Sequence, residues 1–285
     1  MPIASMYRNF SIYVVVVSLS AVAAPPPQPP EHVKWIAHRG GVVDKRFAEN
    51  SPDSLEAARE HGYWMIECDI RETADHRIIV HHDPNFQRFY NDPRRVADLT
   101  YAEVRKLRAT PGGTAPMNFS ELAHLAAKAK LRIMLDVKEP EHSEAFYQEL
   151  ERDLRAAGLL ESTYVIGLDS ALRHFKGKAR VGASVAHLRQ ALAAGEDLAK
   201  LYFLFEWGRE LTAEKVRYAQ QHQVAVVPSV NTFHYTQGGR GMGREGKTYP
   251  GGLDLAKDGA ADLQRLRALG VSEFQIDSVY EVAFR

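Results

Sequence analysis

From residue 33 onward, short runs of β-branched and aromatic residues alternate with stretches of helical periodicity. Apolar residues at every second position indicate strands, whereas apolar residues three and four positions apart indicate helices. Strands that alternate with helices are typical of a parallel sheet with helical crossover connections. We expect helices at 51–61, 119–130, 144–157, 212–221 and 255–269. We expect eight strands, at 33–37, 64–70, 131–137, 163–167, 179–183, 201–205, 224–230 and 273–277.

Eight strand–helix units that close on themselves form a (β/α)8 TIM barrel. The 285 residues accommodate one barrel of about 250 residues or two small domains, so the order of the elements decides between them. We predict a single barrel domain at 33–285, with an open doubly wound sheet as the alternative. A further strand run at 77–81 is expected to pair beside the second strand as a hairpin.

The N-terminal segment differs in composition from the rest of the chain. Arg8 precedes an apolar run at 12–24 that is shorter than the roughly 20 residues needed to span a bilayer, and Ala-Val-Ala at 21–23 offers a cleavage site. We expect residues 1–24 to be a signal peptide, with an uncleaved anchor as the alternative. Residues 25–32 contain five prolines and should form a stiff extended spacer. Either alternative exports the barrel to the periplasm or the extracellular space.

The charge balance excludes a global electrostatic field, and the cysteine content excludes an internal disulfide. Lys plus Arg and Asp plus Glu each number 36, so no global field attracts nucleic acid or anionic lipid, and any anion site must be local. The single cysteine, Cys68, excludes an internal disulfide, which a domain of this size does not need.

Carboxylates end the second and third predicted strands, where a barrel assembles its active site. Glu67 and Asp69 point to one side and Cys68 to the other, because side chains alternate along a strand. Asp136 and Lys138 repeat this spacing. Converging carboxylates need a compensating positive charge, and an all-oxygen set suits Mg²⁺ or Ca²⁺ better than zinc. The alternative is that they are ordinary solvent-facing charges. Lys138 would screen the cluster or hold a phosphate oxygen.

Two histidines lie where a barrel presents its site. His38 ends the first strand, and His82 follows the hairpin strand and precedes a turn at Asp83-Pro84, while His81 should face away. A pair of histidines can act as acid and base near pH 7, although a lone histidine is more often structural. Arg39 has the geometry to bind phosphate through two hydrogen bonds, although an arginine after a strand is more often simply solvated.

Gly40 and Gly41 follow Arg39 in the turn after the first strand. Glycine lacks a Cβ and lets the backbone come close to another group. We expect these two glycines to let the backbone approach a ligand.

Four motifs together resemble the glycerophosphodiester phosphodiesterase family in residue type, order and spacing: His38-Arg39-Gly40, Glu49-Asn50-Ser51, Glu67-x-Asp69 and His82-Asp83. The resemblance continues through 96–100 and 119–122 and weakens after Asp136-x-Lys138. It implies a barrel that uses one divalent cation to hydrolyse glycerophosphodiesters to sn-glycerol 3-phosphate and an alcohol. It implies roles for eight residues: His38 and His82 as acid and base, Glu67, Asp69 and Asp136 as metal ligands, and Arg39, Lys138 and Glu49 as substrate-binding residues, with Glu49 near the metal.

Two positions depart from the family pattern. Asp136 stands where the family usually has glutamate, and Pro228-Ser229-Val230-Asn231 stands where it often has Trp-Thr-x-Asn, so a wall of the glycerol pocket should be missing. Two other functions therefore stay open. One is a lysophospholipase D-like lipid phosphodiesterase, favoured if Phe86, Phe89 and Tyr90 are exposed at the barrel mouth, which leaves membrane contact open. A buried packing role for these three residues is the equal alternative. The other is a secreted phosphate-ligand binding protein with weakened catalysis.

Residues 241–248 match the P-loop pattern, and the first six of them match the dinucleotide pattern. A P-loop needs a strand directly before it and a helix directly after it. About ten residues separate this segment from the preceding strand, and Pro250 blocks an immediate helix, so we expect no bound nucleotide. We expect a long loop at 232–253 that serves as a lid over the phosphate or head group.

Overall fold

The computed structural model describes residues 32–43, 46–232 and 252–283. The predicted signal peptide, nearly all of the proline spacer, the glycine-rich pattern and most of the predicted lid lie outside these ranges. Within them, no helix combines the length and the apolar character needed to cross a membrane.

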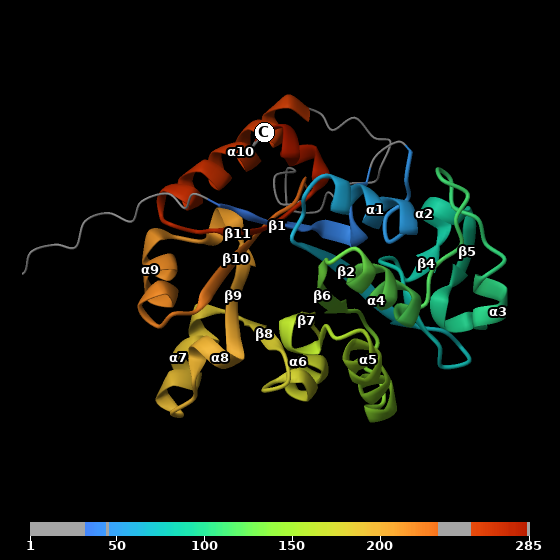
Figure 1. Ribbon diagram of the computed structural model, residues 1–285, viewed down its shortest axis with the longest axis horizontal. Coiled ribbons are helices and arrows are strands. Elements are labelled where there is room, and N and C mark those ends of the chain that lie inside the picture. Colours follow the sequence, from blue (N-terminus) through green and yellow to red (C-terminus); the bar gives the residue numbers. More distant parts are fainter. Residues whose placement is uncertain (1–31, 44–45, 233–251, 284–285) are drawn as a thin grey trace, which may run out of the picture.

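Parallel strands form a closed barrel, as predicted (Figure 1). The order is β1-β11-β10-β9-β8-β7-β6-β2, and the pairing of β1 with β2 closes the ring and excludes an open sheet. Each predicted strand is present, with its ends shifted by two residues or fewer. The bounds are β1 Lys34–Ala37, β2 Met65–Glu72, β6 Arg132–Val137, β7 Tyr164–Gly167, β8 Arg180–Ala183, β9 Tyr202–Trp207, β10 Ala225–Val230 and β11 Glu273–Ile276.

Helices cover the outside of the ring (Figure 1). The five predicted ones are α1 Pro52–Glu60, α4 Phe119–Lys128, α5 Glu144–Ala156, α9 Ala213–Gln221 and α10 Gly252–Ala268. Side-chain caps fix several starts: Ser51 and Asn118 accept the N–H of the residue three positions later, which satisfies a donor with no partner in the helix. Other helices around the ring were not predicted: α6 Asp169–Phe175, α7 Val185–Ala193, α8 Leu198–Leu201, and the 3₁₀ turns η1 His38–Gly40, η3 Leu160–Ser162, η4 Gly208–Glu210 and η7 Ser278–Ala283.

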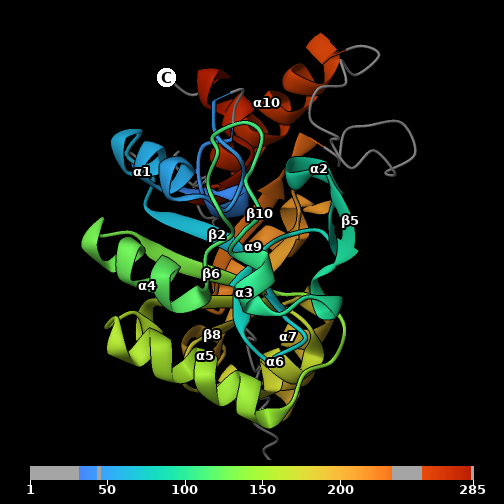
Figure 2. The ribbon, with the colours of Figure 1, turned by 90° about the vertical axis from the view of Figure 1, so that its right-hand side faces the viewer.

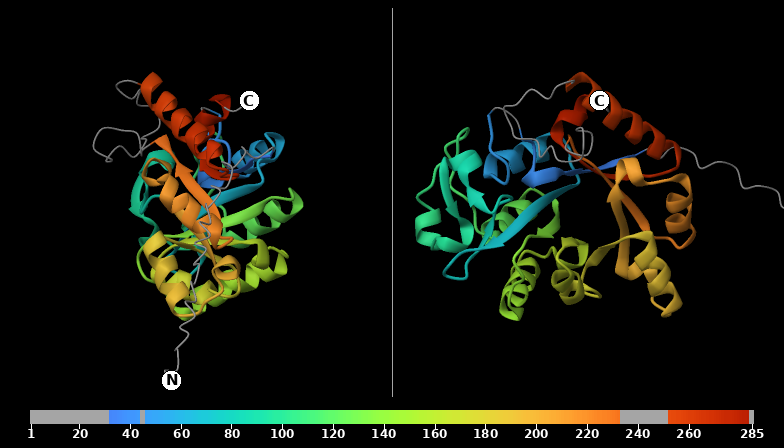
Figure 3. Two further views of the ribbon diagram at one scale, coloured as in Figure 1. Left: turned by 90° about the vertical axis from the view of Figure 1, so that its left-hand side faces the viewer. Right: turned by 180° about the vertical axis from the view of Figure 1, so that it is seen from behind.

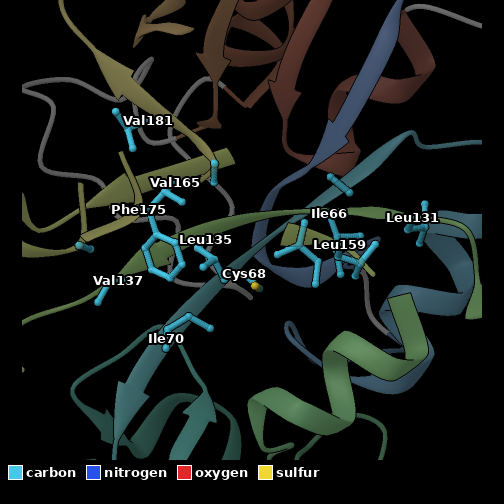
Figure 4. Packing of buried hydrophobic residues seen from close by; sticks show 14 of the residues in the cluster. Ile66, Cys68, Ile70, Leu131, Leu135, Val137, Leu159, Val165, Phe175 and Val181 are labelled. Atoms are coloured by element: carbon cyan, nitrogen blue, oxygen red, sulfur yellow. The ribbon is translucent and has the colours of Figure 1, made fainter. Parts of the chain in front are cut away.

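Two apolar layers hold the barrel together. The larger layer lies between strands and helices, and Cys68 is buried there near Ile66, Ile70 and Leu135 (Figure 4). The smaller layer fills the barrel interior, where Met65, Met134, Phe203 and other side chains pack. Cys68 thus faces away from Glu67 and Asp69, as the alternation predicted. The apolar groups of the interior thus lie below the carboxyl ends of the strands, where Glu67, Asp69 and Asp136 are found.

Residues 78–104 form a lobe outside the ring of strands (Figures 2 and 3). The predicted hairpin strand, β3 Ile78–Val80, pairs antiparallel with β2. The rest of the lobe was not predicted: β4 Asn85–Phe86, α2 Gln87–Tyr90, β5 Asp92–Arg95, η2 Val96–Asp98 and α3 Tyr101–Val104. Phe86 and Phe89 are 0% and 5% exposed and Tyr90 is half-buried, so they pack the lobe. The exposed aromatic mouth that would favour a lipid substrate is absent from these three positions.

Candidate active site

The predicted carboxylates converge at the carboxyl ends of β2 and β6. Asp69 and Asp136 are direct partners in the register of these two strands. Glu67, Asp69 and Asp136 each offer an oxygen, and the three oxygens lie within 4.8 Å of one another, so the group can hold a metal ion. Glu67 and Asp69 are 1% and 0% exposed, which excludes the alternative that they are ordinary solvent-facing charges.

Lys138 alone does not neutralise the negative charge of these three carboxylates. Lys138 Nζ contacts Asp136 Oδ2 and lies 2.9 Å from Asp69 Oδ1, at an angle that does not suit a hydrogen bond. Burial raises the pKa of Glu67 well above its ordinary value, and repulsion from Asp69 and Asp136 adds to this. Burial also opposes ionisation of Asp69, but Lys138, His82 and Arg39 outweigh it and lower its pKa. Glu67 Oε1 is buried without a hydrogen bond, so the donor set fits a hard cation.

The turn after β1 brings Arg39 to the cluster. Its backbone is left-handed (φ 57°), and its N–H donates to Glu67 Oε2 at 2.7 Å. A Cβ on Gly40 would lie 2.7 Å from the Asn50 Cα, and one on Gly41 would lie 2.0 Å from the Ser54 carbonyl oxygen. The absence of a Cβ at these glycines lets the backbone pack against residues 50–54. This packing also allows the Asn50 amide to donate to Asp69 Oδ2 at 3.0 Å. The expected approach of the two glycines to a ligand stays a prediction.

His38 is held by a residue that we did not predict for the site. Its Nδ1 lies 2.6 Å from Asp277 Oδ1, and its Nε2 lies 3.9 Å from Glu67 Oε2. Asp277 Oδ2 accepts from the Thr232 N–H and hydroxyl at 2.7 and 2.8 Å. Burial opposes ionisation of Asp277, but His38 and Arg39 outweigh it and hold its pKa well below the ordinary value. Asp277 follows β11 as His38 follows β1, and that signal was available in the sequence.

His82, like His38, is held by an aspartate. Its Nδ1 lies 2.8 Å from Asp83 Oδ1, and its Nε2 lies 3.5 Å from Arg39 Nη2. Each histidine is thus fixed through Nδ1 by an aspartate, which leaves Nε2 to face the site. His81 stacks on Phe86 with 4.6 Å between ring centroids, so it faces away as expected.

Arg88 lies on helix α2, which was not predicted, and it contacts residues that hold His82 and Arg39. Its Nε donates to Asp83 Oδ2 at 2.7 Å, and its Nη1 donates to Glu49 Oε2 at 2.7 Å. Glu49 Oε2 also accepts from Arg39 Nη1 at 2.9 Å. We predicted that Glu49 binds substrate near the metal. Instead, both of its oxygens are taken by guanidinium groups, because Arg88 also contacts Oε1, so Glu49 positions Arg39.

Replacing Arg88 with methionine should lower kcat about 10–100-fold and the free energy of unfolding by about 3 kcal/mol. The change leaves Glu49 and Asp83 without their shared cation, so Arg39 and His82 lose their fixed geometry. Kinetics at a temperature where the variant is folded, together with urea unfolding, measure both effects. Arg94→Met is the matched control from the same lobe, because Arg94 makes an exposed pair with Asp92. Equal effects of the two changes would contradict the prediction.

We expected Pro228 to remove a wall of the glycerol pocket, but this residue does not face the pocket. Val226 and Val230 belong to the layer between strands and helices, so Pro228 faces outward with them by alternation along β10. A tryptophan at this position would not line the site, so no wall is lost. The inner face of β10 carries Ser229, whose partner on β9 is Trp207, 40% exposed at the barrel mouth.

A model of the glycerophosphoryl diester phosphodiesterase family matches residues 38–242 of the chain. Over 80 residues, the chain is 35% identical to glycerophosphodiester phosphodiesterase 1 of Bos taurus, an alignment that covers 28% of the chain and 24% of the relative. Over 71 residues it is 34% identical to a lysophospholipase D of Homo sapiens, covering 25% of the chain and 22% of the relative. The chain thus spans about a quarter of the length of these curated relatives.

Solved structures share the fold. A phosphodiesterase of Oleispira antarctica, solved with the product sn-glycerol 3-phosphate, superimposes with a TM-score of 0.61 at 15% identity. The match covers 88% of this chain and 96% of that one.

Proposed function

Because the chain belongs to the glycerophosphoryl diester phosphodiesterase family, we propose that it hydrolyses glycerophosphodiesters to sn-glycerol 3-phosphate and an alcohol. One observation carries the proposal: two histidines, each held through Nδ1 by an aspartate, flank three carboxylates whose oxygens lie within 4.8 Å of one another. The product in the Oleispira antarctica structure supports this choice of substrate.

In this proposal Glu67, Asp69 and Asp136 hold one divalent cation, Mg²⁺ or Ca²⁺. When bound, the cation supplies a positive charge that neutralises a nonbridging phosphate oxygen. Arg39 and Lys138, at the rim of the cluster, bind phosphate oxygens. Their positive charges also offset the buried carboxylates before substrate arrives.

The two histidines transfer the protons in the proposed reaction. One Nε2 takes a proton from the attacking hydroxyl, and the other gives a proton to the leaving alcohol. The family resemblance points to the adjacent glycerol hydroxyl as the first nucleophile, giving a cyclic phosphate that water then opens. Asp277 and Asp83 keep each ring in the orientation that this transfer requires.

Purified chain should release sn-glycerol 3-phosphate from glycerophosphocholine when Mg²⁺ or Ca²⁺ is present. An assay coupled to glycerol 3-phosphate oxidation measures this release. The lipid substrate is tested separately with lysophosphatidylcholine, in an assay coupled to oxidation of the choline released. Turnover of the short substrate with either cation is the expected result. Silence with every substrate and both cations, combined with retained binding of glycerol 3-phosphate, would contradict hydrolysis and favour a binding protein.

A lysophospholipase D-like activity is the second candidate, supported by the similarity to the human lysophospholipase D. The buried positions of Phe86 and Phe89 argue against it, because these two side chains provide no apolar surface for an acyl chain, whereas Trp207 is 40% exposed at the mouth. A catalytically weakened binding protein has less support. Asp136, one of the two departures behind that idea, completes the carboxylate set, and Pro228, the other, faces away from the site.

A further inference from the structure

Arg71 continues the row of site residues along β2. Glu67, Asp69 and Arg71 stand at every second position of this strand, so their side chains project from the same face. Arg71 is half-buried there. Burial lowers its pKa, and nearby carboxylates, Asp69 first among them, oppose this lowering. A charged guanidinium therefore lies just beyond the carboxylate cluster.

The donors of Arg71 are directed at backbone oxygens of two different segments. Its Nε and Nη2 both donate to the His82 carbonyl oxygen, at 2.9 and 2.7 Å. Its Nη1 donates to the Glu139 carbonyl oxygen at 2.7 Å. Among the described residues Arg71 forms no salt bridge with a carboxylate. Charge pairing therefore does not explain its position, whereas the bridge between the two segments does.

The segment on the Glu139 side of this bridge is itself firmly held. The Lys138 N–H donates to a carbonyl oxygen of β2 at 3.1 Å. The side chain of His142, 1% exposed, lies between Lys138 and Glu72 of β2. Its Nε2 is 2.9 Å from the Lys138 carbonyl oxygen, and its Nδ1 is 2.9 Å from Glu72 Oε2. The segment after β6 thus gives Arg71 a fixed point of attachment.

The turn that carries His82 needs such an attachment on its barrel side. The strand before it, β3, ends two residues earlier, and the His81 N–H donates to the Asp69 carbonyl oxygen at 2.8 Å. The ring of His82 is held by Asp83, which belongs to the same turn. That contact fixes the ring within the turn but does not place the turn beside the carboxylate cluster. The two bonds from Arg71 to the His82 carbonyl oxygen do so.

We propose that Arg71 is a positioning residue that joins the His82 turn to the Lys138 segment and so holds His82 Nε2 where it transfers a proton. This inference rests on the proposed function and names what keeps one of its acid–base groups in place. Arg71 acts through His82 and touches neither substrate nor cation. Lysine cannot replace it, because an ammonium lacks the planar fork that donates two bonds to one oxygen and a third to another.

A double-variant cycle on kcat tests this role. Arg71→Ala should lower kcat for glycerophosphocholine about 10–100-fold, the loss expected when a catalytic group is displaced by about 1 Å. In the His82→Ala background the same change should lower kcat less than about threefold, because the residue through which Arg71 acts is already gone. Arg71→Lys keeps the charge without the fork, and should show the same pattern in both backgrounds.

Two further measurements separate positioning from a general loss of structure. Arg71→Ala should keep the ion-dependent rise in Tm, because Arg71 forms no salt bridge with the three carboxylates of the cluster. Arg77→Ala, an exposed change in the same hairpin, is the matched control and should keep wild-type kcat.

Equal losses from Arg71→Ala in the wild-type and His82→Ala backgrounds would overturn the positioning role alone. Wild-type kcat in Arg71→Lys would overturn it too, because charge would then suffice, as would loss of the ion response in Arg71→Ala. Failure of the wild-type chain to hydrolyse the diester would overturn the proposed function and the role of Arg71 with it.

Discussion

Replacing His38 or His82 with alanine should lower kcat about 10²–10⁴-fold, the usual contribution of general acid–base catalysis. Each ring is fixed by a short contact from Nδ1 to an aspartate, at 2.6 Å for His38 and 2.8 Å for His82. Without the imidazole, the Nε2 that faces the site and carries the proton in the proposed reaction is lost. Steady-state kinetics with glycerophosphocholine, and circular dichroism to show that the barrel persists, measure the result.

His124→Ala is the matched control, because His124 is exposed on the outer helix α4. It should keep wild-type turnover. If either His38→Ala or His82→Ala retained more than a tenth of wild-type kcat, that histidine would not be the acid or the base.

Exhaustive chelation should abolish turnover, and adding back Mg²⁺ or Ca²⁺ should restore it. The same ion should raise Tm by about 5–10 °C at a concentration near 100 times its Kd, the stabilisation expected for a ligand that binds only the folded chain. The physical reason is the buried cluster itself, since Lys138 pairs with only two of the three carboxylates and Glu67 Oε1 lacks a hydrogen bond. Differential scanning fluorimetry with each ion, beside the activity assay, measures both effects.

Glu67→Gln should remove both the activity and the ion-dependent rise in Tm, because it takes one ligand from the set. Glu273→Gln is the matched control: Glu273 is also buried within the barrel, but at the opposite end, where it pairs with Lys34 and Tyr164. This variant should still respond to the ion. An ion response in Glu67→Gln equal to that of wild type would rule out the carboxylate cluster as the metal site.

The sequence correctly predicted those features that depend on residues close together along the chain. The strand runs and the alternation of Glu67, Cys68 and Asp69 follow from local periodicity, and the structure places all three as that periodicity predicts. His38 and His82 were recognised because each follows a strand, and the barrel brings both to the same end.

Local periodicity gave less information about the lobe. Its strands and helices are short, with two to four residues each in β4, α2, β5 and α3, so no periodic pattern builds up. For this reason Arg88 was not recognised, and Phe86 was considered for the mouth although it is buried.

What the sequence by itself determined is the barrel, the order of its elements and the residue types at its strand ends, because these depend on spacing within a few residues. Only the tertiary structure decided which side chains contact one another in the site. Asp277 meets His38 across 239 residues of chain, and Arg88 meets Glu49 across 39. Such contacts arise only when β1 packs beside β11 and the lobe folds back on β2. Closure of the ring therefore converts separate motifs into one site.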